Sequence, residues 1–150
     1  MTPDRGNLGA SPTLVRAVLG VLGGIQLVDG LYALFAPRSF YDDFPLGRGW
    51  VEALPSYSEH LVRDVGSLFL ATAVFLFAAA WILERRLVLV ALVSFLVFSV
   101  PHFIYHSFNL KPYSTGDAIG NFVGLLLTVV APVALLVMMR RGTAGSERSP

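Results

Sequence analysis

Four long apolar stretches, separated by short polar segments, dominate the chain. They run from about Thr13 to Ala36, from Glu59 to Leu83, from Leu87 to Phe108 and from Thr115 to Met139. Each is close to the ~20 residues that an α-helix needs to cross about 30 Å of hydrocarbon. The pattern therefore predicts an all-α integral membrane protein, an antiparallel four-helix transmembrane bundle in which successive spans run in opposite directions.

The segments outside these stretches predict the domain limits and the orientation. We expect a loose N-terminal segment at 1–12, a transmembrane domain at 13–140 and a flexible cytoplasmic tail at 141–150. Arginine pairs occur at Arg85-Arg86, between the second and third spans, and at Arg140-Arg141, after the fourth. Short loops rich in Lys and Arg stay in the cytoplasm. The chain is thus predicted to be a multi-pass plasma membrane protein with both termini cytoplasmic.

The segment between the first two spans, residues 37–58, is unusually aromatic. It holds Phe40, Tyr41, Phe44, Trp50 and Tyr57 among polar residues. Amphipathic rings favour the membrane–water interface, so we expect a short ordered interfacial segment here. Two roles remain open for it: a lid over polar groups in the bundle, or a simple anchor in the lipid headgroups.

Composition narrows the possible chemistry. The chain is 55% hydrophobic and 14% charged, with a net charge of +1, and has no basic stripe that would favour nucleic acid. It has no cysteine, which rules out disulfides and thiolate ligands. Any divalent metal would be held by imidazole and oxygen, a donor set that suits zinc, iron, copper or manganese.

Polar and ionisable residues gather toward one side of the predicted membrane. Ten of them lie at the end of the first and third spans or at the start of the second and fourth: Asp29, Glu59, His60, Arg63, Asp64, His102, His106, Asn109, Asp117 and Asn121. Charged groups in hydrocarbon cost several kcal/mol unless they are paired, so such a cluster is a functional-site hypothesis. We expect one pocket near the outer leaflet. The alternative is a polar plug that only specifies helix packing.

The second span carries most of the candidate catalytic residues. His60 and Asp64 are four apart, as are Glu59 and Arg63, so each pair shares a helical stripe. Asp64 would orient the His60 imidazole, and we expect it within hydrogen-bonding reach of His60, Arg63 or a third-span histidine and screened from lipid. With Asp29 of the first span, these four form the candidate catalytic set. The alternative is a self-neutralising group of ion pairs that orders the helix start.

The third span presents His102 and His106 on one face. Two histidines at i and i+4 are a recurrent half-site for a metal, but Phe103 stands where the zinc-protease motif has a glutamate. We expect a metal held by His102, His106 and Asp117, or acid–base chemistry without metal. A lipid-like molecule or quinone would contact four further residues: Asn121, Asn109, Tyr32 and Trp50. Glu59 and Asp117 also have a structural explanation, since each completes a capping box, with Ser56 and Ser114 respectively.

Three motifs together carry a resemblance to a known family. They are Ser58-Glu59-His60-Leu61-Val62-Arg63-Asp64-Val65-Gly66, then Val100-Pro101-His102-x-x-x-His106, then Asp117-x-x-x-Asn121. Over Gly20 to about Val137 the chain resembles small four-span actinobacterial proteins of the DoxX-like superfamily. The resemblance implies a four-helix membrane bundle whose shared site includes most of the cluster. Superfamily relatives are linked to quinone-dependent oxidation and membrane carboxylation, but no catalytic residue carries over.

Two functions from different classes follow. The first is a membrane enzyme or ligand-binding protein acting on a lipid-like or other hydrophobic substrate. The second is a non-catalytic accessory subunit of a larger membrane complex, or a homo-oligomer, with the aromatic segment as its contact surface. Haem ligation by His60 and a third-span histidine is a further reading. Ion transfer is disfavoured, because the middle of the second and third spans offers almost no polar residues beyond Thr72 and Ser94.

Overall fold

The computed structural model describes residues 8–54 and 56–146. This part of the chain is all-helical, with α1 (Pro12–Phe35), α2 (Pro37–Asp43), α3 (Glu59–Ile82), α4 (Arg85–Phe108) and α5 (Thr115–Ser146). Four of these helices are long and apolar enough to cross a membrane: α1, α3, α4 and the Thr115–Arg141 part of α5. The chain is therefore a multi-pass integral membrane protein, as the pattern of apolar stretches predicts.

The helix boundaries follow from local chemistry. Pro12 opens α1, where a missing backbone N–H costs nothing, and α1 ends at Phe35 just before Pro37. The turn from α3 to α4 passes through Leu83, which adopts a left-handed conformation with φ 56°. The predicted boundaries lie within a few residues of the observed ones, except that α5 continues beyond Met139 to Ser146.

Both expected terminal segments lie partly outside the described residues, which exclude 1–7 and 147–150. Within the segment expected to be loose, Leu8 is buried and belongs to the hydrophobic core. Within the segment expected to be a flexible tail, residues 141–146 continue the helix α5.

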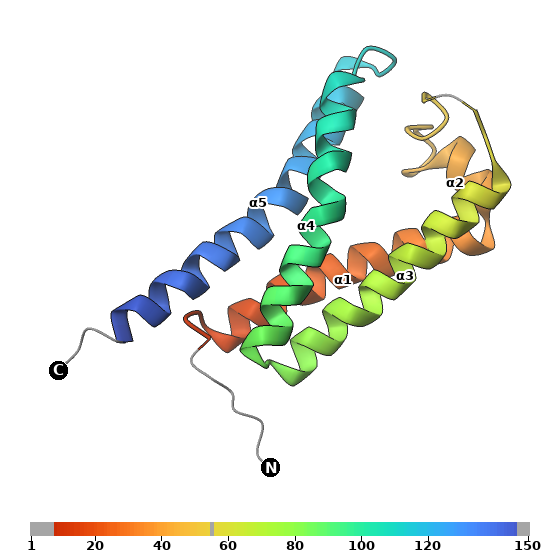
Figure 1. Cartoon of the computed structure of the whole chain (residues 1–150). Coiled ribbons are helices and arrows are strands. Elements are labelled where there is room, and N and C mark those ends of the chain that lie inside the picture. Colours follow the sequence, from red (N-terminus) through yellow and green to blue (C-terminus); the bar gives the residue numbers. More distant parts are fainter. Residues whose placement is uncertain (1–7, 55, 147–150) are drawn as a thin grey trace.

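The four long helices form two pairs that meet at one end and spread apart at the other (Figure 1). Helix α1 packs along α3, and α4 packs along α5. We call the end where the pairs meet the closed end. It holds the core, which comes from the start of α1, the end of α3, the start of α4 and the later part of α5: Leu8, Val15, Leu19, Leu22, Leu76, Ala79, Leu83, Val88, Ala91, Leu92, Phe95, Leu135 and Met139.

Close packing of α1 on α3 depends on two glycines. A Cβ atom on Gly66 would lie 2.7 Å from the backbone nitrogen of Leu34, and one on Gly30 would lie 2.9 Å from the carbonyl oxygen of Gly66. Real Cβ atoms do not approach backbone so closely, and only glycine permits this contact. This pair of helices is therefore joined backbone to backbone near the end where α1 and α4 have spread apart, which we call the open end.

Residues 37–54 and 56–58, which we call the strap, lie at the open end (Figure 1). The strap begins with α2, which Tyr32 holds against α1: the phenol hydroxyl donates to the Ser39 carbonyl at 3.1 Å and lies 2.8 Å from the Ser39 hydroxyl. Its ring also packs edge-on against Phe40, with centroids 5.5 Å apart. The strap thus starts on one helix pair, and its later residues reach the other.

Candidate functional site

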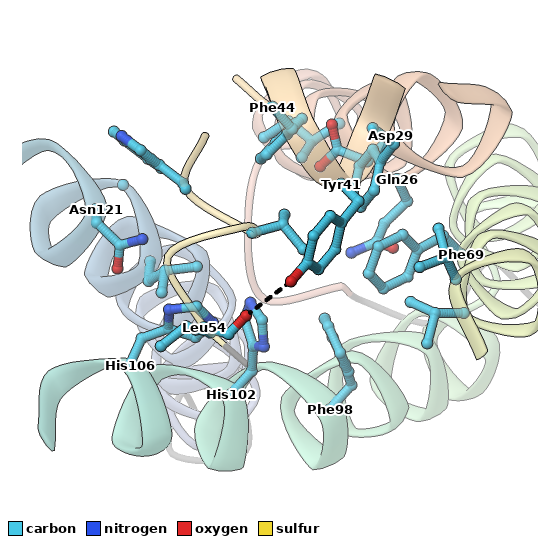
Figure 2. A pocket seen from close by; sticks show the side chains of 18 of the residues that line it. Gln26, Asp29, Tyr41, Phe44, Leu54, Phe69, Phe98, His102, His106 and Asn121 are labelled. Carbon is cyan, nitrogen blue, oxygen red and sulfur yellow. Dashed lines mark hydrogen bonds between the residues drawn. The ribbon is translucent and has the colours of Figure 1, made fainter. Parts of the chain in front are cut away.

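A cavity of about 520 Å³ opens between the two helix pairs at the open end (Figure 2). All five helices and the strap line it. Most of its wall is apolar and aromatic, with Phe69 from α3, Phe98 from α4 and Leu125 from α5 among its residues. Its polar lining is confined to a few side chains, which come from different helices. This combination is typical of small-molecule sites between helices.

Helix α1 contributes Gln26 and Asp29, one turn apart. Gln26 is only 5% exposed, and its side-chain oxygen Oε1 is buried without a hydrogen-bond partner. Asp29 is half-buried, and no hydrogen bond or ion pair joins its carboxylate to another of the described residues. The α1 wall therefore presents an amide and a carboxylate whose bonding capacity the chain leaves unused.

Helix α4 contributes the two histidines. The rings of His102 and His106 lie edge to face with centroids 4.5 Å apart, and His102 also stacks on Phe98 at 5.0 Å. The Nδ1 atom of His106 is buried without a partner. Both rings point toward the cavity (Figure 2). The predicted histidine stripe therefore exists, and it faces a pocket.

Helix α5 contributes Asn121 and Thr128. Asn121 is 3% exposed, and its Oδ1 is buried without a partner. The Thr128 hydroxyl donates to the Leu125 carbonyl at 2.7 Å, so this group is already satisfied within the helix. Asn121 is thus the available polar group on this wall, across the cavity from Gln26 (Figure 2).

The strap forms a further wall of the cavity. Tyr41, Phe44 and Trp50 line it, and the Tyr41 hydroxyl donates to the Leu54 carbonyl at 3.3 Å (Figure 2). Of the two roles considered for the aromatic segment, this position fits a lid over the polar groups. Several aromatic rings of the strap therefore face the cavity.

Three hydrogen bonds tie the strap to α5 and the turn before it. Asp117 Oδ1 accepts from Arg48 Nη1 at 2.6 Å and from Trp50 Nε1 at 2.9 Å. The Tyr113 hydroxyl donates to the Trp50 carbonyl at 2.7 Å. Burial, together with nearby Tyr105, raises the pKa of Tyr113, so the phenol keeps the proton that it donates. We call these three bonds the latch.

The latch gives Asp117 a structural role in place of the arrangement expected for a metal ligand. Its second oxygen, Oδ2, accepts from the Ser114 hydroxyl at 2.6 Å, and its backbone N–H donates back to that hydroxyl, as the capping box predicts. Both carboxylate oxygens are thus occupied. Within residues 8–54 and 56–146, no three His, Cys, Asp or Glu side chains are arranged to hold a metal ion. The set of His102, His106 and Asp117 is therefore not assembled.

Glu59 and Arg63 are also placed differently from the prediction. Arg63 Nε donates to Glu59 Oε1 at 2.9 Å, and Arg63 Nη1 donates to the Leu34 carbonyl at the end of α1. Neither residue lines the cavity. They join the start of α3 to the end of α1, which matches the ion-pair alternative rather than a catalytic role.

His60 and Asp64 form their predicted pair, with Nε2 and Oδ2 3.1 Å apart, but they lie outside the pocket. Their side chains are 81% and 56% exposed. Asp64 was also expected to be screened from lipid, but the described part of the chain leaves its side chain largely exposed. The cavity is lined instead by Leu61, Val65 and Phe69, which repeat every four residues on another face of α3. The single cluster of ten residues is therefore divided.

Two of the four predicted substrate contacts also have structural roles. Tyr32 holds α2 on α1, and Asn109 Nδ2 donates to the Tyr105 carbonyl at 2.7 Å where α4 ends. Neither lines the cavity, whereas Trp50 and Asn121 do. Asp29, His102, His106, Asn121 and Trp50 are thus the predicted site residues that the structure brings together.

Several residues of the site and its latch were not identified from the sequence. Gln26 interrupts the first span and shares a helical arc with Asp29, but it was not among the predicted site residues. The aromatic content of the strap indicated order but not which rings would face a cavity. Arg48 and Tyr113 gave no signal, because their partners lie 69 and 63 residues away in the chain.

Comparison with known proteins finds no family model, curated protein or solved structure that matches the chain. The fold and the cavity are therefore the features that indicate a function.

Proposed function

We propose that the protein binds an amphiphilic, lipid-like small molecule in the open-end cavity. One observation carries the proposal: three buried polar atoms without partners belong to residues that line this cavity, Gln26 Oε1, His106 Nδ1 and Asn121 Oδ1. A buried polar group left unsatisfied costs about 1–3 kcal/mol. Three such groups from three different helices favour a ligand whose polar part completes their hydrogen bonds.

The remaining wall suits the apolar part of such a molecule. Aromatic and aliphatic side chains from all five helices surround the space, and its volume of about 520 Å³ falls within the ~300–1,000 Å³ typical of ligand pockets. The cavity lies between transmembrane helix pairs, where a molecule dissolved in the bilayer reaches it directly. The lipid bilayer is then both the environment of the protein and the source of its ligand.

Orientation follows from the arginines of the closed end. Arg85, Arg86, Arg140 and Arg141 would keep both termini in the cytoplasm, with the protein in the plasma membrane. The strap and the cavity would then face the outer leaflet. Membership of the DoxX-like superfamily is part of this proposal, supported by the three motifs and by the four-span architecture.

Acid–base chemistry is the reaction type that the site supports best, should the ligand be a substrate. His102 and His106 lie side by side on the cavity wall, and Asp29 lies on the opposite helix pair. Imidazole exchanges protons near neutral pH and is the usual general base. A zinc, iron, copper or manganese ion would draw two ligands from α4, but Asp117 would not supply a third.

Filling the cavity tests the proposal. A Cβ atom on Gly124, which lines the cavity, would meet nothing within 4 Å, so Gly124→Leu places a side chain in the space without a backbone clash. Gly20→Leu is the matched control, because a Cβ there also meets nothing within 4 Å and Gly20 does not line the cavity. The readout is mass spectrometry of small molecules extracted from purified protein.

We expect one class of amphiphile to be enriched with the wild type and the control, and to be lost from Gly124→Leu. Equal amounts of the same molecules with all three proteins would contradict the proposal.

A non-catalytic role in a larger membrane complex or homo-oligomer is the second candidate. One observation favours it: the exposed His60–Asp64 pair lies within a candidate span, where an ion pair facing lipid is costly and a protein partner would cover it. Replacing both residues by leucine should then release the partner or the second copy in mild detergent. Unchanged association would remove this candidate.

A further inference from the structure

We infer that the ligand of the open-end cavity is a lipophilic amine, a molecule with an apolar body and a positively charged nitrogen. This inference rests on the proposed function and names the chemical class of its ligand. It depends on the carboxyl group that lines the cavity, on the aromatic rings around it and on the ion pairs that hold three nearby arginines elsewhere.

Of the described residues on the cavity wall, Asp29 is the only acidic one, and none of the Lys or Arg side chains lines the wall with it. Among the residues that the structure describes, none forms an ion pair with Asp29, His102 and His106 included. A carboxylate among apolar side chains is costly without a partner. The cavity wall therefore holds a carboxyl group with no ion-pair partner among the described residues, and a cationic ligand would supply one.

The arginines of the open end are engaged elsewhere. Arg38 pairs with Asp42 at 2.6 Å, Arg48 pairs with Asp117 at 2.6 Å, and Arg63 pairs with Glu59 at 2.9 Å. Each of these guanidinium groups would have to give up an existing partner to reach Asp29. The Asp29 carboxyl group is thus left for a molecule that enters the cavity.

The aromatic rings of the wall also favour a cation. The ring centroids of Phe40 and Phe44 are 4.8 Å apart on the wall that the strap forms, and Tyr41 and Trp50 lie on the same wall. The faces of aromatic rings attract ammonium groups, and the effect is strongest where water is excluded.

Anionic headgroups fit this site poorly. A phosphate or a fatty-acid carboxylate would enter a cavity that already holds Asp29, and no arginine or lysine among the described lining residues would bind it. A neutral alcohol would satisfy Gln26 or Asn121 but would leave Asp29 without a counter-charge. For molecules that share one alkyl chain, we therefore expect the affinity to fall from the amine to the alcohol and then to the carboxylate.

Trp50 provides a reporter for this test. The chain has two tryptophans, and Trp81 is 86% exposed and does not line the cavity, whereas Trp50 does. In a Trp81→Phe background, the fluorescence of Trp50 therefore reports on the cavity alone. The protein is placed in nanodiscs of neutral lipid and titrated with dodecylamine, dodecyltrimethylammonium, dodecanol and dodecanoate, with concentrations expressed per lipid.

We expect dodecylamine to half-saturate the Trp50 signal at a concentration about tenfold below that of dodecanol, because its ammonium group donates charge-assisted hydrogen bonds. Dodecyltrimethylammonium has no N–H donor, so it should bind between the two, through its charge and the aromatic rings alone. Asp29→Asn should remove this difference, and Asp29→Glu should retain most of it. Asp64→Asn is the matched control: it removes an exposed carboxylate outside the cavity and should leave the order of affinities unchanged.

The outcomes separate this inference from the proposed function. If dodecanol binds as tightly as the amines, or if Asp29→Asn keeps the preference for amines, the amine inference is overturned while a general amphiphile site stands. If no probe changes the Trp50 signal, or if Gly124→Leu responds as the wild type does, both are overturned.

Discussion

Trp50 donates its indole N–H to Asp117 over a distance of 2.9 Å, although the two residues are 67 positions apart in the chain. This bond connects the strap, which begins on α1, to the start of α5. It bridges the two helix pairs at the end where they have spread apart, and Trp50 also forms part of the cavity wall. The same side chain thus links the closure of the strap to the shape of the site.

Removing the indole donor should loosen the strap. Trp50→Phe keeps an aromatic ring but loses the bond to Asp117, so we expect faster amide hydrogen exchange in residues 44–54, measured by mass spectrometry. Trp81→Phe is the control, because that side chain is 86% exposed and forms no part of the latch. Unchanged exchange in the strap of Trp50→Phe would show that the latch does not hold it.

The two glycines between α1 and α3 should be essential for stability. A Cβ on Gly66 would lie 2.7 Å from the Leu34 nitrogen, so Gly66→Ala must push the helices apart. Overpacking of this kind costs about 1–3 kcal/mol. We expect a clear loss of thermal stability in detergent, whereas Gly24→Ala, where a Cβ meets nothing within 4 Å, should have little effect. Equal melting temperatures of the two variants would contradict the close helix contact.

The histidines should differ in their effect on ligand binding. His102 lines the cavity, whereas His60 is 81% exposed on another face of α3. We therefore expect His102→Ala to reduce the amount of amphiphile that co-purifies with the protein, and His60→Ala to leave it near the wild-type level. Mass spectrometry of extracted small molecules measures both. A larger effect of His60→Ala than of His102→Ala would mean that the exposed His60–Asp64 pair takes part in ligand binding.

Divalent metal binding should not depend on Asp117. Both oxygens of its carboxylate are already engaged by Arg48, Trp50 and Ser114. Calorimetric titration with zinc should therefore give the same affinity for the wild type and for Asp117→Asn, while His106→Ala should weaken any binding that the wild type shows. Loss of zinc affinity in Asp117→Asn alone would restore the three-residue metal set.

Part of the site could be inferred from the sequence because helical spacing is local. Residues four apart share a stripe, so the pairing of His60 with Asp64 and of Glu59 with Arg63 followed from their positions, and both pairs form. The spacing of residues along one helix does not show which way each stripe faces in the folded protein. The direction depends on how α3 is rotated against α1, which the Gly30–Gly66 contact determines.

What the sequence by itself determined is the number, length and boundaries of the spans. In a membrane each helix must satisfy its own backbone hydrogen bonds and match the thickness of the hydrocarbon, so the apolar stretches are sufficient to define it. The tertiary structure alone decided the contents of the site. It spread the helix pairs apart and turned His60 and Asp64 outward. It also used Asp117 to hold the strap, because its partners Arg48 and Trp50 come from a segment that only folding brings near.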